Sequence, residues 1–155
     1  MTRKLVWRGL DAPRMEIAHV DVDGATLVAR GTQIGRAYEL RYELSGGSGS
    51  LLLDVVGDRT VEVELGDADF FDLGYSPLYN SLPVLAHDLH LGGGVRDFTM
   101  TWIDVPSLAV RQSRQRYEPL DPGCVRYREG SFAADIEFDD EGFVTYYPGL
   151  AERIS

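Results

Sequence analysis

Residues 38–44, Tyr-Glu-Leu-Arg-Tyr-Glu-Leu, alternate apolar and charged side chains with a period of two. Because successive side chains of a β-strand point to opposite faces, this alternation predicts a strand with one face in the core and the other in water. The same pattern returns in residues 61–65 and 132–138. Turn signals separate such segments at Asp23-Gly24, residues 45–49, Gly57-Asp58, residues 92–94, residues 121–123 and Glu141-Gly142. Their spacing predicts antiparallel strands joined by hairpins.

Helical periodicity is weak along the chain, so only short helical turns are expected, at Ser76–Tyr79 and near Pro148–Arg153. About ten strands with one wet face each must curl to enclose a core, which is either filled or hollow. The chain is therefore predicted to be mostly β, a curved antiparallel sheet forming a barrel or half-barrel, with at most one or two short helical turns. Its 155 residues suffice for a single domain, residues 1–155.

Residues 72–84, DLGYSPLYNSLPV, interrupt the regular strands, and we call them the irregular segment. Two prolines fix φ, one glycine allows conformations closed to other residues, and large apolar side chains lie between them. This composition predicts an ordered bend, with a short helical turn opened by Ser76-Pro77, rather than a flexible linker.

The irregular segment resembles the DLGFSPLTN-LP signature of a bacterial family named "putative glycolipid-binding". Further blocks of the chain are similar to the same family, in order: residues 5–11, 29–34, 102–108, 115–117 and 147–150. The resemblance covers essentially the whole chain. It implies a half-barrel like those of lipid carriers, and a lipid or glycolipid as the ligand.

Charge and cysteine content exclude several function classes. A net charge of −10 argues against binding to nucleic acids, which requires a dominant positive field. Cys124 is the only cysteine, so neither a disulfide framework nor a thiolate metal cluster is expected, and a reducing cytoplasm fits best. No segment approaches the roughly 18 apolar residues of a membrane span, and residues 5–7 are too short a run for a signal peptide. We expect a cytoplasmic protein without integral membrane association.

Aromatic residues gather around the irregular segment and suggest an amphiphile site, because Tyr and Trp combine an apolar body with a polar tip. The alternative is that each of them simply belongs to the core. Residues 98–103 are apolar on both strand faces, so core is expected on one face and the irregular segment or a ligand on the other. The predicted ligand-binding residues are Tyr75, Leu78, Tyr79 and Leu82 at the entrance, and Phe98, Met100 and Trp102 in the wall.

Five arginines form a local basic strip in an otherwise acidic chain. They fall on two predicted strands joined by the turn at residues 121–123, and they are Arg111, Arg114, Arg116, Arg126 and Arg128. Facing arginines repel each other unless acids or an anionic head group lie between them. We therefore predict that Arg114 or Arg116 meets an anionic head group. The alternative is a solvated strip paired to Asp and Glu side chains.

No motif indicates metal binding or catalysis. Two groups of polar residues were considered as metal ligands: His19, Asp21 and Asp23, and His87, Asp88 and His90. The three-residue spacing of His87 and His90 in the second group suits a helix better than a strand, and solvated polar residues are the expected alternative. A Gly-x-Ser-x-Gly nucleophile elbow is absent, and Asp69 with Asp72 would be the pair to suspect in acid–base catalysis.

The leading functional hypothesis is non-enzymatic binding of a lipid-like or glycolipid-like amphiphile in an apolar groove on a curved sheet, without cofactors. The alternative is a protein-interaction or homodimerisation module that uses the same apolar face. A third hypothesis is an enzyme that acts on a lipid or glycan.

Overall fold

The computed structural model describes residues 2–24, 26–46 and 49–155. In these ranges the chain forms thirteen strands in one sheet and a helical segment between β7 and β8. The strands are β1 (Thr2–Gly9), β2 (Met15–Asp23), β3 (Thr26–Ile34), β4 (Glu39–Ser45), β5 (Ser50–Val55), β6 (Arg59–Glu64), β7 (Phe70–Leu73), β8 (Arg96–Ile103), β9 (Val110–Asp121), β10 (Cys124–Glu129), β11 (Phe132–Phe138), β12 (Val144–Tyr147) and β13 (Ala151–Arg153). The helical segment comprises the 3-10 turn η1 (Pro77–Asn80), helix α1 (Ser81–His87) and the 3-10 turn η2 (Leu89–Leu91).

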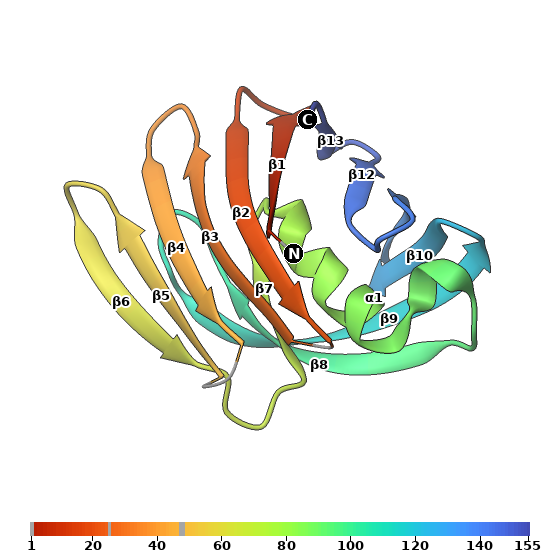
Figure 1. The fold of residues 1–155 in the computed structure, drawn as a ribbon. Coiled ribbons are helices and arrows are strands. Elements are labelled where there is room, and N and C mark those ends of the chain that lie inside the picture. The colour runs from red at the N-terminus through yellow and green to blue at the C-terminus, as the bar shows by residue number, and fades with distance from the viewer. Residues whose placement is uncertain (1, 25, 47–48) are drawn as a thin grey trace.

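The sheet is curved and does not close. Its strand order is β6-β5-β4-β3-β2-β1-β13-β12-β11-β10-β9-β8-β7, and neighbours are antiparallel except in the parallel pair β7–β8. Figure 1 shows β1 to β6 along one side, β8 to β10 along the other, and the helical segment in the hollow between them. The predicted mostly β fold with a curved sheet is therefore confirmed, and of the two expected forms the structure is the half-barrel.

The edges of the sheet, β6 and β7, follow each other directly in the chain. The connection at residues 65–69 therefore spans the seam where the sheet fails to close. Hydrogen bonds fix this connection: the Leu65 amide donates to the Gly49 carbonyl at 2.7 Å, and the Thr101 hydroxyl donates to the Leu65 carbonyl at 2.9 Å. The candidate site lies beside this seam.

The period of two predicts the strand faces correctly. In β4, Leu40, Tyr42 and Leu44 are buried, whereas Arg41 and Glu43 are exposed. Cross-strand pairs then carry the same parity through the sheet, because paired residues lie on the same face.

Two predicted turns differ from the structure. Residues 151–153 form strand β13, since they pair with both β1 and β12. Three residues are too few for an alternating pattern to predict such a strand. Residues 92–94 connect η2 to β8 and are therefore not a hairpin turn. In the predicted turn at residues 45–49, residues 47–48 lie outside the described part of the chain.

The helical segment extends beyond the turn expected at Ser76–Tyr79. Pro77 opens η1, where its fixed φ and missing N–H are compatible with a helix start. The helix continues to Asp88, whose left-handed conformation (φ 52°) ends it. Most of residues 76–84 are buried, so the segment lacks the polar, solvent-exposed face by which an amphipathic helix is recognised in a sequence. In the described ranges no helix combines the length and hydropathy of a membrane span.

Two apolar clusters fill the half-barrel. The first joins inward residues of β1–β6 with Leu73 and Ile103 of β7 and β8. The second joins Phe98 and Met100 with residues of β9–β12 and with Val84 of α1. Strand β8 is thus covered on both faces, and the irregular segment contributes to both covers, with Leu78 and Tyr79 in the first cluster and Val84 in the second.

Candidate functional site

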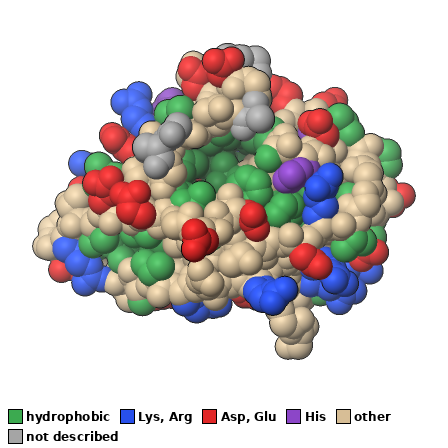
Figure 2. Space-filling model, turned by 90° about the horizontal axis from the view of Figure 1, so that it is seen from below, with side chains coloured by type: hydrophobic (Ala, Val, Ile, Leu, Met, Phe, Trp, Pro, Cys, Tyr) green, Lys and Arg blue, Asp and Glu red, His purple; other side chains and the backbone are tan. Residues whose placement is uncertain are grey.

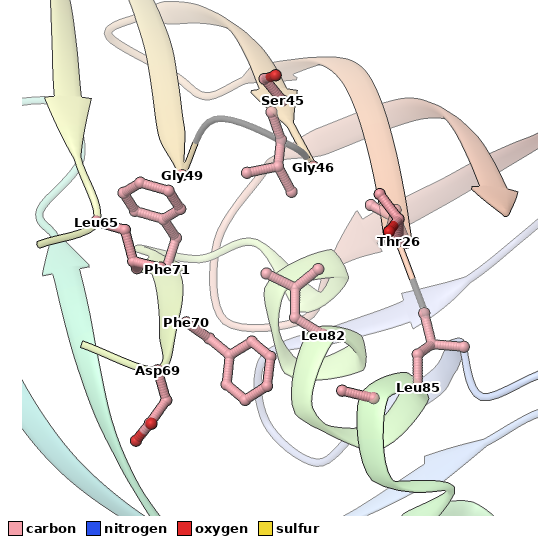
Figure 3. Close-up of a pocket in the computed structure, with 13 residues that line it drawn as sticks. Thr26, Ser45, Gly46, Gly49, Leu65, Asp69, Phe70, Phe71, Leu82 and Leu85 are labelled. Atoms are coloured by element: carbon pink, nitrogen blue, oxygen red, sulfur yellow. The ribbon is translucent and has the colours of Figure 1, made fainter. Parts of the chain in front are cut away.

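An apolar hollow of about 200 Å³ opens beside the seam, between α1 and the nearby strand ends. We call it the apolar mouth. Figure 2 shows the hollow lined by hydrophobic side chains, and Figure 3 shows leucines of α1 facing the phenylalanines of β7 across it. Its apolar lining residues are Leu27, Leu44, Leu65, Phe70, Phe71, Leu82, Leu85 and Ala86, and its remaining ones are Thr26, Ser45, Gly46, Gly49 and Asp69.

The floor of the mouth is buried and its walls are half-buried. Leu27, Leu44 and Phe71 in the floor are 7%, 6% and 3% exposed. Leu82 and Leu85 in the helical wall keep part of their apolar surface in contact with water. A ligand that covers such surface gains roughly 25 cal/mol per Å² of apolar area removed from water. The mouth therefore suits the end of an alkyl chain.

The rim of the mouth is polar, and among the described residues that line it the one charged residue is acidic. Thr26, Ser45 and Asp69 are exposed there. The Asp69 Oδ2 accepts a hydrogen bond from the Thr99 amide at 2.8 Å, and Figure 3 shows this carboxylate pointing away from α1. In Figure 2 acidic side chains lie on several sides of the hollow, and a histidine and a basic side chain lie at one edge. A negative rim favours a neutral or cationic head group over an anionic one.

A buried carboxylate, Glu16 of β2, fixes the start of the irregular segment. Its Oε2 accepts hydrogen bonds from the Ser76 hydroxyl at 2.7 Å and the Tyr42 hydroxyl at 2.8 Å, and its Oε1 accepts one from Gln33 Nε2 at 3.2 Å. Burial raises the pKa of Glu16, although these hydrogen bonds act in the opposite direction. Because one buried group binds three separate elements, it positions the segment that leads into α1.

Tyr42 reaches Glu16 only because residue 31 is a glycine. A Cβ on Gly31 would lie 2.2 Å from both Cζ and Oη of Tyr42. Gly31 pairs with Tyr42 across β3 and β4, so the ring lies directly over the glycine backbone. Tyr42 also packs edge-on against Tyr79 with ring centroids 5.6 Å apart. This packing supports the inner side of the irregular segment.

Side-chain hydrogen bonds also hold the start of α1 against the second half of the sheet. The Ser81 hydroxyl accepts a hydrogen bond from the Val144 amide at 3.2 Å, and Asn80 Nδ2 donates to the Tyr117 hydroxyl at 3.1 Å. The helical wall of the mouth is therefore anchored at its N-terminal end, on the side away from Leu85.

The structure separates the predicted entrance and wall residues. Leu82 lines the apolar mouth. Leu78 and Tyr79 are core residues at 0% and 1% exposure, and Phe98 and Met100 belong to the second apolar cluster. The alternative that these aromatics and aliphatics form core thus describes four of the seven.

The other two, Tyr75 and Trp102, line a second cavity, which we call the polar pocket. It has a volume of about 240 Å³, and its polar lining includes Asp72, Asn80, Tyr127, Glu129 and Tyr147. Phe70, at the start of β7, lines the mouth, whereas Asp72, near its end, lines this pocket.

Arg114 and Arg116 line a further hollow together with Phe98 of the predicted wall, although their side chains leave β9 on its other face. Register pairs Phe98 with Gln115, so Arg114 and Arg116 project from the opposite face of β9. Both are exposed, and Arg116 forms a two-bond ion pair with Asp97 at 2.7 and 3.0 Å. That Arg114 or Arg116 meets an anionic head group therefore stays a prediction, and such a group would be bound where these two arginines, Arg128 and Phe98 line a further hollow.

The rest of the basic strip divides between the two faces of the sheet. Arg126 pairs with Asp135 at 2.8 Å on the outer face, as the solvated-strip alternative predicts. Arg111 lies over the ring of Trp102 at 4.3 Å on the inner face and pairs with Glu129 at 3.4 Å. An anionic head group bound by Arg114 or Arg116 would lie outside both cavities.

The residues considered for metal binding and catalysis are dispersed. Within the described ranges no three His, Cys, Asp or Glu residues are grouped to hold a metal ion. His90 is buried, with Nε2 3.1 Å from the Asp140 carbonyl, and His87 packs against Phe70. Asp69 and Asp72 belong to different cavities, so they do not form an acid–base pair.

Sequence reasoning missed the anchor and most of the mouth. Glu16 shares its strand face with Ala18 and Val20, and a charge on an apolar face was a readable signal. Phe70 belongs to the aromatic residues gathered around the irregular segment, but Leu85 gave no signal, because it lies on a helix that the sequence did not reveal.

Comparisons with known proteins agree with this fold. A family described as "Putative glycolipid-binding" matches residues 53–153. A crystal structure of a DUF1089 family protein from Pseudomonas aeruginosa has a similar fold, with a TM-score of 0.59 and 24% sequence identity over 92% of this chain and 79% of that one. No curated protein matches the chain. The chain belongs to the "Putative glycolipid-binding" family.

Proposed function

We propose that the protein binds the apolar chain of a lipid-like or glycolipid-like amphiphile in the apolar mouth, without converting it chemically. The observation that carries this proposal is an apolar floor of Leu27, Leu44 and Phe71 that is reached from solvent between α1 and the seam. The volume of about 200 Å³ accommodates the end of one chain.

The head group is expected to be uncharged or cationic and to remain at the rim. Asp69, Thr26 and Ser45 supply hydrogen-bonding groups there, and the nearest charge is negative. Of these groups, the Asp69 carboxylate is already engaged by the Thr99 amide, which supports binding rather than acid–base chemistry. The free thiol of Cys124 suits a reducing compartment, and we place the protein in the cytoplasm.

Native mass spectrometry after incubation with an alkyl glycoside, such as octyl glucoside, tests this proposal. Binding in the mouth predicts a one-to-one complex that weakens several-fold in Leu82→Gln, because a polar group then faces the chain. Leu91→Gln is the control, since Leu91 is 66% exposed and outside the mouth. Thermal melts of both variants show whether they remain folded.

Three results would overturn the proposal. The first is a wild-type protein that binds no alkyl glycoside. The second is equal binding by the Leu82→Gln and Leu91→Gln variants. The third is a concentration-dependent dimer whose formation Leu82→Gln abolishes, which would indicate that the mouth contacts a second copy of the chain.

A further inference from the structure

The polar pocket differs chemically from the mouth and lies at the opposite end of β7. Aromatic residues form much of its wall, with Trp102 on β8, Tyr127 on β10 and Tyr147 on β12. Tyr127 lies near the centre of this group, 6.3 Å from the ring of Tyr147 and 6.1 Å from that of Phe132. Aromatic walls from separate strands give the pocket flat apolar surfaces with polar tips.

Two hydroxyl groups in this wall have no hydrogen-bond partner among the described residues. Tyr127 and Tyr147 are 5% and 7% exposed, yet neither hydroxyl forms a hydrogen bond within residues 2–24, 26–46 and 49–155. They are also absent from the fully enclosed polar atoms without a partner, so both hydroxyls retain access to the pocket. A buried tyrosine normally finds a partner for its hydroxyl, which makes two free ones in one cavity a sign of a ligand.

A carboxylate with one free oxygen faces the same cavity. Asp72 is 8% exposed, and its Oδ2 accepts a hydrogen bond from Gln115 Nε2 at 2.7 Å. Its Oδ1 accepts none from the described residues and is not enclosed. Gln115 in turn donates to the Ser113 hydroxyl at 3.2 Å, which keeps its amide directed at Asp72. The carboxyl is therefore held in place with acceptor capacity left over.

The charges around the pocket narrow the class of ligand. Three carboxylates, Asp72, Asp104 and Glu129, line it and disfavour an anion. Arg111 covers the Trp102 ring at 4.3 Å, so the aromatic face best suited to a cation is already occupied. An ammonium group only donates hydrogen bonds, whereas tyrosine hydroxyls and the Asn80 amide also offer donors that need an acceptor. A ligand hydroxyl both donates and accepts.

We propose that the polar pocket binds one sugar ring, with its hydroxyls bonded to Asp72, Tyr127 and Tyr147. The volume of about 240 Å³ is below the range of roughly 300–1,000 Å³ of sites for drug-sized ligands, which limits the occupant to about one ring. The apolar C–H face of a pyranose matches the aromatic wall. Sugar binding here does not depend on lipid binding in the mouth.

Titration of the protein with methyl glycosides of glucose, galactose and mannose, followed by saturation-transfer NMR and calorimetry, tests the assignment. At least one glycoside is expected to bind. Its affinity should fall roughly 10-fold when the two tyrosine hydroxyls are removed in the double variant Tyr127→Phe, Tyr147→Phe. The variant Tyr146→Phe is the matched control, because Tyr146 is 37% exposed and does not line the pocket.

Asp72→Asn gives a second test, since this variant keeps the size of the side chain and should weaken sugar binding while the protein remains folded. The assignment is wrong if the folded wild-type protein binds none of the glycosides at millimolar concentration. Unchanged affinity in the double tyrosine variant also contradicts it. Displacement of the sugar by tetramethylammonium would favour a cation site, and loss of sugar binding only in Leu82→Gln would move the sugar to the mouth.

Discussion

Among the described residues two carboxylates are buried, Glu16 and Asp72, and they lie in different surroundings. Glu16 accepts hydrogen bonds from Ser76, Tyr42 and Gln33 and lines none of the cavities described above. Asp72 accepts one from Gln115 and borders the polar pocket. Burial alone therefore does not identify a carboxylate as part of a ligand-binding site. A carboxylate whose two oxygens both accept hydrogen bonds from the protein holds several strands or loops together. A carboxylate with one free oxygen is available to a ligand.

The largest expected loss of stability follows from replacing Glu16. Glu16→Ala leaves three buried groups without their acceptor and should lower the free energy of unfolding by about 3–5 kcal/mol. Urea denaturation measures the loss, and Glu43→Ala on the exposed face of β4 should change stability by less than about 0.5 kcal/mol. A loss below about 1 kcal/mol in Glu16→Ala would show that Glu16 does not anchor the irregular segment.

The second effect is an increase in the free energy of unfolding, and it is expected when Asp72 is replaced. Burial raises the pKa of this carboxyl to about 6 from its ordinary 3.8. The folded state therefore binds the proton more tightly than the unfolded state, so its contribution to stability is present below pH 4 and is lost as pH rises to about 6. A difference of about 2 pKa units corresponds to up to about 3 kcal/mol.

The Asp72→Asn variant no longer has to bury an ionised carboxylate at neutral pH. The variant should be more stable than the wild type at pH 7 and similar to it at pH 4, and thermal melts across this range measure the difference. Because the two proteins differ only at residue 72, the change of their stability difference with pH reports on the carboxyl of Asp72. A constant difference between pH 4 and pH 7 would contradict the raised pKa.

The smallest of the three effects is a steric test of the anchor. In Gly31→Ala the new Cβ collides with the Tyr42 ring and should lower the free energy of unfolding by about 1–3 kcal/mol. Gly94→Ala is the control, because a Cβ at that position meets open space. Equal melting temperatures for the two variants would mean that the Tyr42 ring can move away from residue 31 without a loss of stability.

The sequence predicted the strands and the half-barrel because alternation is a local property, as in residues 38–44. It did not reveal α1, since most of residues 76–84 are buried and their composition carries no amphipathic stripe. It also could not place Arg114 relative to Phe98. Parity puts Arg114 and Arg116 on one face of β9, but only the register with β8 shows that this face lies opposite the apolar wall.

The candidate cavities were predictable only in part. Tyr75 and Leu82 were predicted from the irregular segment and Trp102 from the strand with two apolar faces, and each lines a cavity. The unpartnered hydroxyls of Tyr127 and Tyr147 depend on three strands meeting around one space, which no local pattern encodes. Glu16 could have been recognised, because its charge interrupts an apolar strand face.

The most direct measurement is a methyl and aromatic NMR titration of the protein with octyl glucoside. Binding of the alkyl chain in the mouth predicts saturable shifts of the Leu27, Leu44, Leu82 and Leu85 methyl groups at constant molecular mass. Shifts confined to the outer face of the sheet, or no shifts below the concentration at which the detergent forms micelles, would contradict lipid binding in the apolar mouth.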